Sequence, residues 1–163
     1  MLQRPLIDAL EFARPRGRLS GDWPIADFPR LQGAVQSGTP LQYVLEGVPE
    51  EQGRPALRLT VTGTLQLSCQ RCLGALEHPL QVDALLLLYG SESEIDSIPV
   101  DAETPDGIVA TKEMAVRDLI EEEVLLAIPY APRHGGCKGG TDAKDAPGAR
   151  PFADLRSLLG TKH

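Results

Sequence analysis

Two runs of alternating apolar and polar residues occupy the middle of the chain. The first covers residues 57–68 and the second covers residues 76–89. Leucine and valine take every second position over most of both runs. A period of two places one set of side chains on a buried face and the other set toward solvent. Two such runs around a short break predict an antiparallel hairpin.

A third run precedes the hairpin, where Leu41, Tyr43 and Leu45 alternate with polar and smaller residues. The Gly and Pro-rich residues 47–55 then favour a turn. We therefore expect an antiparallel meander of three or more strands. After it, residues 95–100 predict a short edge strand, and residues 108–110 predict a further short extended piece.

After residue 111 the apolar residues recur at the spacing of a helix instead of at every second position. Residues 112–127 contain no Gly or Pro, and Pro129 stops the pattern. We expect Thr111 to cap this helix and the helix to pack on the sheet through Leu119 and Val124. The expected solvent side carries residues 121–123, which are all Glu. The last turn is apolar nearly all round, which predicts that it is buried.

These patterns predict an α+β fold: an antiparallel β-meander with a packed helix in the C-terminal half and a short C-terminal helix. We expect one domain over residues 1–163, with a core at about 34–130. Residues 8–13 predict one or two helical turns, and residues 14–21 read as a loop. Residues 138–149 have the composition of a flexible linker, and residues 151–160 predict an amphipathic helix.

The candidate chemistry lies at the tip of the hairpin. Cys69 and Cys72 form a Cys-x-x-Cys turn, and His134 and Cys137 form a second half-motif on a Gly-rich segment. Three sulfurs and one imidazole are a legitimate tetrahedral Zn²⁺ set. We expect Gly74 to relieve the backbone of the turn where a positive φ is needed.

Other interpretations of these residues stay open. The cysteines can be free thiols, whereas a redox pair is disfavoured because a strand precedes it rather than a helix N-terminus. Arg71 is interpreted as a solvating residue at the tip, and His78 as an edge or core residue. Asp118, Glu121 and Glu122 share a helix face that could bind a cation, but a plain helix surface explains them better.

Charge and cysteine usage restrict the function classes. The formal net charge is −7, and residues 91–128 carry eleven acids against two bases, a balance of −9. Tight non-specific binding to bare nucleic acid requires a basic face, so it is not expected. The acidic run is interpreted as a solvated surface, with a docking surface for a basic protein as the alternative. Three cysteines and the lack of a signal-like or membrane-spanning run predict a cytoplasmic protein.

Four stretches together resemble a known family. They are Cys69-Gln70-Arg71-Cys72, residues 118–132 with their Glu-rich start and Pro-Tyr-Ala-Pro end, Cys137, and residues 151–155. In this order they are similar to the large ribosomal RNA subunit accumulation proteins, the YceD-like proteins of bacteria and plastids. The resemblance spans roughly residues 5–160 and implies a role in accumulation of 23S ribosomal RNA. It implies no enzymatic activity and supplies no catalytic residues.

The expected function is therefore a non-enzymatic factor in biogenesis of the large ribosomal subunit. Its expected partners are a ribosomal protein, an rRNA-processing factor or a precursor of the large subunit, with direct RNA binding weak or assisted by the partner. No membrane partner is expected. The alternative is a small zinc-binding, RNA-binding module. A nuclease has little support, because no acid–base pair is recognisable.

Overall fold

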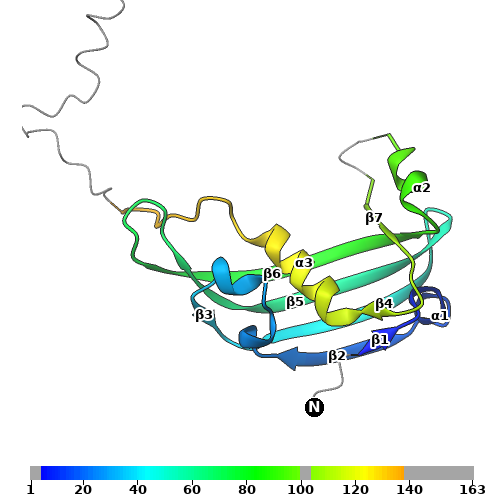
Figure 1. Cartoon of the computed structure of the whole chain (residues 1–163), viewed down its shortest axis with the longest axis horizontal. Helices are drawn as coiled ribbons and strands as arrows, with labels where there is room; N and C mark the ends of the chain where they lie inside the picture. Colours follow the sequence, from blue (N-terminus) through cyan, green and yellow to red (C-terminus); the bar gives the residue numbers. More distant parts are fainter. Residues whose placement is uncertain (1–4, 100–103, 138–163) are drawn as a thin grey trace, which may run out of the picture.

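Three long antiparallel strands form the centre of the fold in the computed structural model, which describes residues 5–99 and 104–137. They are β4 (Leu41–Glu51), β5 (Arg54–Ser68) and β6 (Ala75–Tyr89), and they pair in sequence order. The α+β fold and the meander predicted from the alternating runs are confirmed (Figure 1). The hairpin of β5 and β6 ends at the cysteine turn.

Shorter strands extend this sheet on both sides. The strand order is β2-β4-β5-β6-β7, and β3 pairs with the last part of β5. All of these pairs are antiparallel except β6 with β7, which is parallel. A separate two-stranded sheet joins β1 to β8. The bounds are β1 (Leu6–Ile7), β2 (Arg18–Trp23), β3 (Ser37–Gly38), β7 (Asp106–Val109) and β8 (Met114–Ala115).

One face of the sheet is apolar, and the other is polar except for a small apolar cluster around Ala56, Leu87 and Tyr89. On β5 the alternating residues Leu57, Leu59 and Val61 are fully buried. The opposite face carries the row Arg18, Glu46, Arg58 and Asp83, in which Arg18 pairs with Glu46 and the Arg58 guanidinium binds Asp83 at 2.8 Å. These exposed pairs order the polar face, while burial of the apolar face supplies most of the stabilisation.

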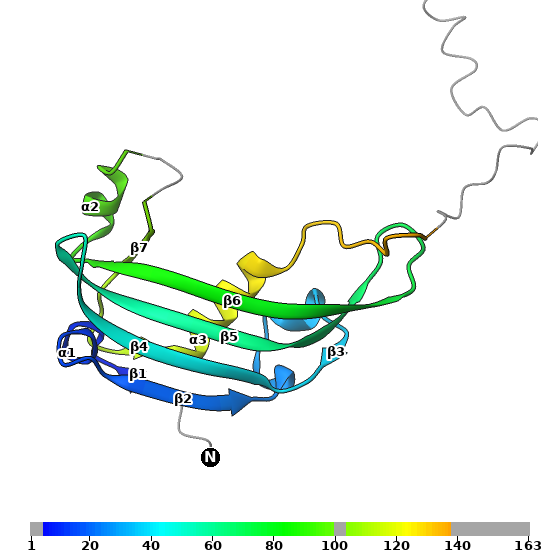
Figure 2. The same cartoon turned by 180° about the vertical axis from the view of Figure 1, so that it is seen from behind.

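The helix α3 (Val116–Ala127) covers the apolar face, and Figure 2 shows the same strands from behind. Val116, Ile120 and Val124 are fully buried against the sheet, whereas Leu119 is only half-buried at the edge of the core. The predicted packing is confirmed, but the predicted start is wrong. Thr111 does not cap the helix, because residues 114–115 pair with β1 and delay its first turn to Val116.

The predicted burial of the last turn of α3 holds in part for Leu125 and Ile128, which pack partly buried against the core, but it is wrong for Leu126. Leu126 is 73% exposed and Tyr130 is fully exposed. Val116, Ile120 and Val124 face the core, and Leu119, Leu125 and Ile128 pack partly buried against it, whereas Leu126 is exposed to solvent. Two large side chains, Leu126 and Tyr130, are therefore exposed at and just after the end of α3.

The expectation that the glutamates at residues 121–123 all face solvent is wrong for Glu121. Its side chain is 2% exposed, and its Oε1 accepts the backbone N–H of Arg30 at 2.6 Å. Arg30 begins the short 3₁₀ helix η2 (Leu31–Gly33). The carboxylate therefore ties this turn to α3, two elements that are far apart in sequence.

We expect the substitution Glu121→Ala to lower the free energy of unfolding by about 1–3 kcal/mol, because the Arg30 N–H loses its acceptor inside the protein. Glu121→Gln keeps an acceptor oxygen and should cost less. The exposed Glu122 provides a matched control on the next residue, and Glu122→Ala should change stability by no more than about 0.5 kcal/mol. Urea unfolding of the three variants checks this order, and equal effects for Glu121→Ala and Glu122→Ala would contradict it.

The N-terminal segment also contributes to the core. The helix α1 (Ala9–Ala13) is capped by the Asp8 carboxylate, which confirms the predicted helical turns. A Cβ on Gly47 would lie 2.4 Å from the Phe12 carbonyl oxygen, so glycine there allows α1 to approach β4. Part of the predicted loop at residues 14–21 instead belongs to β2. Its Trp23 stacks on Tyr43 with ring centroids 5.5 Å apart, which adds an aromatic contact to the backbone pairing with β4.

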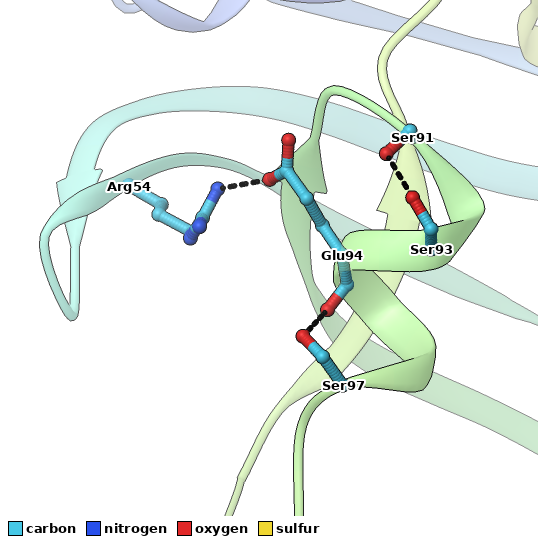
Figure 3. Close-up of polar contacts among 5 residues, drawn as sticks. All are labelled: Arg54, Ser91, Ser93, Glu94 and Ser97. Carbon is cyan, nitrogen blue, oxygen red and sulfur yellow. Dashed lines mark hydrogen bonds and ion pairs between the residues drawn. The ribbon is translucent and has the colours of Figure 1, made fainter.

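The predicted edge strand over residues 95–100 is replaced by the helix α2 (Glu92–Asp96) and a turn. Figure 3 shows how this helix is held. Arg54, which follows the β4–β5 turn, donates to the Glu94 carboxylate at 3.2 Å and lies 4.2 Å from the centre of the Tyr89 ring. The Ser97 hydroxyl donates to the Glu94 carbonyl at 2.7 Å and closes the last turn. By contrast, the extended piece predicted near residue 108 is confirmed as β7.

Three predictions concern parts of the chain that the structure leaves undescribed. The linker at 138–149 and the amphipathic helix at 151–160 lie outside the described residues, as does Val100. Among the helices of the described residues, none combines the length and the apolar character required to cross a bilayer.

Candidate metal centre

The turn between β5 and β6 has the backbone geometry of a metal knuckle. The Cys69 N–H donates to the Gly74 carbonyl, and the Leu73 N–H donates to the Cys69 carbonyl, both at 2.9 Å. The positive φ of the turn falls on Leu73, at 60°, so the expectation that Gly74 supplies it is wrong. A Cβ at Gly74 would lie 3.5 Å from the Cys72 sulfur, which is an ordinary van der Waals contact, so the space at this position does not require glycine.

The segment after α3 returns to this turn and brings the second half-motif with it. The Gln70 N–H donates to the Pro132 carbonyl at 2.8 Å, which fixes the segment against the hairpin tip. Two residues later, His134 lies beside Cys72, and Cys137 lies beside Cys69. In Figure 1 the end of the described chain runs next to the β5–β6 tip.

The structure brings all four predicted ligands together. Their ligand atoms lie within 4.8 Å of one another. The Cys69 and Cys137 sulfurs are 3.5 Å apart, and the Cys72 sulfur is 3.4 Å from His134 Nδ1. Ligands at about 2.0–2.3 Å from one tetrahedral ion have mutual separations close to these values. The group Cys69, Cys72, His134 and Cys137 can therefore hold a metal ion.

Hydrogen bonds around the group favour its metal-binding form. His134 Nε2 lies 2.9 Å from the Ala75 carbonyl oxygen. When Nε2 carries the proton and donates to this oxygen, Nδ1 presents its lone pair toward the cysteines. A backbone acceptor on the second ring nitrogen is the usual arrangement for a metal-bound histidine.

The electrostatic surroundings distinguish the cysteines. Donation by the Cys72 backbone N–H is the main cause that lowers the pKa of the Cys69 thiol to about 5, with the N–H groups of His134 and Arg71 adding to it and burial opposing it. Burial raises the pKa of the Cys137 thiol, and the neighbouring Cys69 sulfur raises it further. A backbone that donates to Cys69 stabilises its thiolate, the form that binds metals.

The arrangement has the chemistry of a structural site rather than a catalytic one. Four protein ligands fill a tetrahedral ion and leave no position for water or substrate. Cys69 is fully buried and Cys72 is exposed, so the group lies at the boundary between the core and the surface. A bound ion would join the hairpin tip to residues 129–137.

The other candidate residues do not assemble into a site. Asp118 binds the neighbouring Arg117 at 2.8 Å, and Glu121 is buried with the Arg30 backbone, so their shared helix face does not present a cation site. His78 is a half-buried residue of β6. Tyr130 and the Gln70–Pro132 contact were not singled out from the sequence. The two prolines around Tyr130 were the available signal, because they favour an extended segment with a fixed course.

Comparison with known protein families identified a matching family model. Residues 57–158 match the family model described as "Large ribosomal RNA subunit accumulation protein YceD". The matched region begins in β5 and includes the knuckle, α3 and all four candidate ligands. No curated protein and no solved structure matched the chain.

Proposed function

Because the chain belongs to the YceD family of large ribosomal RNA subunit accumulation proteins, we propose that it promotes the accumulation of 23S rRNA during biogenesis of the large ribosomal subunit. The observation that carries this proposal is the family match over residues 57–158, which includes more than half of the chain. The resemblance noted at the cysteine turn and around Pro129 points to the same family.

The proposed role is that of a cytoplasmic assembly factor without a catalytic step. The family name describes accumulation of an RNA and not a reaction on it. The net charge of −7 opposes extensive binding to bare RNA. It is compatible with a basic ribosomal protein, an rRNA-processing factor or a precursor particle whose RNA is already partly covered.

We further propose that Zn²⁺ is the ion held by Cys69, Cys72, His134 and Cys137. Three thiolates and an imidazole suit Zn²⁺, and the separations of the ligand atoms support a tetrahedral site. The proposed contribution of the metal is mechanical: it fixes residues 129–137 against the hairpin tip. The free energy of metal binding would then stabilise this end of the fold.

The family match does not favour the alternative of a small zinc-binding, RNA-binding module. Such a module would be built around the knuckle alone, whereas the match continues through α3 and beyond Cys137. The knuckle is therefore better understood as one end of a larger assembly factor.

Co-sedimentation tests the proposed function. Lysates are separated on sucrose gradients at low and moderate salt, and the chain is followed together with large-subunit and small-subunit rRNA. We expect it to travel with precursors of the large subunit and to remain there at moderate salt. Migration with free RNA only, or with small-subunit particles, would contradict an assembly role at the large subunit.

A further inference from the structure

A groove of about 520 Å³ lies next to the knuckle. Its walls come from the η2 turn and the residues after it, from the end of β5, and from the segment that follows α3. Leu125, Ile128 and Pro129 contribute apolar surface, and Gln32, Gln36 and Gln70 contribute side-chain amides. No lining residue is charged, although the chain has 23 acids and 16 bases.

An exposed aromatic ring stands at the groove. Tyr130 lines it and is fully exposed, and the neighbouring Leu126 is 73% exposed. Pro129 and Pro132 restrict the backbone on either side of the tyrosine. The hydrogen bond from the Gln70 N–H to the Pro132 carbonyl holds this segment against the hairpin tip. A ring presented on such a restricted segment loses little further backbone freedom when a ligand stacks on it.

The charge around the groove differs from that of the whole chain. Within two sequence positions of a lining residue lie three arginines, Arg30, Arg71 and Arg133, against the single acid Glu123, a balance of +2. A Zn²⁺ ion bound by three thiolates has a charge of −1. With zinc bound, the region around the groove would therefore have a net charge of +1, compared with −7 for the whole chain.

We propose that this groove binds one or two unpaired nucleotides of the large-subunit rRNA, with a base stacked on Tyr130. The glutamine amides can both donate to and accept from the edge of a base, and Arg71 and Arg133 can contact the flanking phosphates. Every base has a stacking face, so this contact is tolerant of sequence. The inference rests on the proposed function and names the surface that meets the RNA.

The contact is local and weak on its own. Few phosphates are reached, so counterion release contributes little, and the acidic remainder of the molecule repels extended RNA. The duplex form of RNA is excluded because its bases are already stacked and paired. The groove therefore selects exposed nucleotides on a particle that other contacts bring close.

Binding of short fluorescent RNA to the purified, zinc-loaded full chain tests the proposal. We expect a single-stranded oligonucleotide of about eight nucleotides to bind more tightly than a duplex of the same sequence. Tyr130→Ala should weaken binding at least fivefold, as expected for loss of one stacked base, and Tyr130→Phe should retain it. Arg133→Ala should reduce the salt dependence by about one phosphate contact.

Arg18→Ala is the matched control, since Arg18 is an exposed arginine on β2 with no part in the groove. It should leave RNA binding unchanged. The proposal is overturned if single strands do not bind, if duplex binds equally well, or if Tyr130→Ala binds like the wild type. It is also overturned if Tyr130 is needed for capture of a ribosomal protein but not of RNA. These outcomes concern only RNA binding by the groove. The proposed function is tested separately, by the rRNA content of depleted cells.

Discussion

The substitution Cys69→Ser is expected to reduce bound zinc from about one ion per chain to about zero. Cys69 is the fully buried ligand, and its sulfur lies 3.5 Å from that of Cys137. A serine hydroxyl is a poor replacement for a thiolate, and three remaining ligands hold the ion far less tightly. Elemental analysis of protein produced with zinc present and purified without chelators measures the change.

The same substitution should release residues 129–137 from the hairpin tip. Arg133 lies within this segment, so the rate of trypsin cleavage after Arg133 reports the release directly. Cleavage should accelerate in Cys69→Ser and in wild-type protein treated with a chelator. Arg71→Ala is the control, because it changes the residue between the two cysteines and removes no ligand. A wild type without zinc, or a Cys69→Ser variant that keeps one ion, would refute the metal site.

The second large effect is expected for Ile120→Asp, which should unfold the protein or leave it barely folded. Ile120 is fully buried between α3 and the sheet. The change removes a large apolar side chain and places a carboxylate in a site without a partner, at a cost of several kcal/mol. Domains of this size have a total stability of only about 5–15 kcal/mol.

Leu126→Asp is the matched control on the same helix, since Leu126 is 73% exposed. It should change the stability by about 0.5 kcal/mol or less. Leu119→Asp should fall between the two, because Leu119 is half-buried. Circular dichroism during urea unfolding gives all three values. A cooperative unfolding curve for Ile120→Asp at the wild-type midpoint would show that α3 does not pack as described.

The strands that could be predicted were those in which apolar and polar residues alternate clearly along the sequence. β4, β5 and β6 alternate clearly because one face is buried and the other is wet. β2 shows the alternation only weakly, because its six residues offer just Leu19 and Trp23 as apolar side chains, with Gly21 between them. Its extended form comes from pairing with β4 and from stacking of Trp23 on Tyr43, and both interactions are tertiary.

Errors in the helices have the same origin. The spacing of α3 was correct, yet its first residues are drawn into β8 by pairing with β1, whose position the sequence does not reveal. Glu121 was expected in solvent because charged residues are almost never buried without a partner. Its partner is a backbone N–H of η2, which no side-chain pattern could indicate. In α2, Ile95 and Ile98 resembled a strand, but the local hydrogen bonds of Glu94 and Ser97 favour a helical turn.

The candidate ligands were predictable because metal chemistry restricts both residue type and spacing. Cys69 and Cys72 indicated a knuckle by themselves, and His134 and Cys137 completed a ligand set. Their convergence depends on the course of residues 128–132, which the Gln70–Pro132 hydrogen bond determines. The groove beside them was not predicted, because its three walls come from distant segments and Tyr130 was expected to follow a buried helix end.

The ratio of large-subunit to small-subunit rRNA in depleted cells tests the central claim most directly. The chain is depleted, both mature rRNAs are quantified by sequencing that also maps their ends, and expression of the wild-type chain restores the ratio as a control. We predict that 23S rRNA falls relative to 16S rRNA and that 23S ends or precursors change. An unchanged ratio after complete depletion, or an equal fall of both rRNAs, would contradict a role in accumulation of the large-subunit RNA.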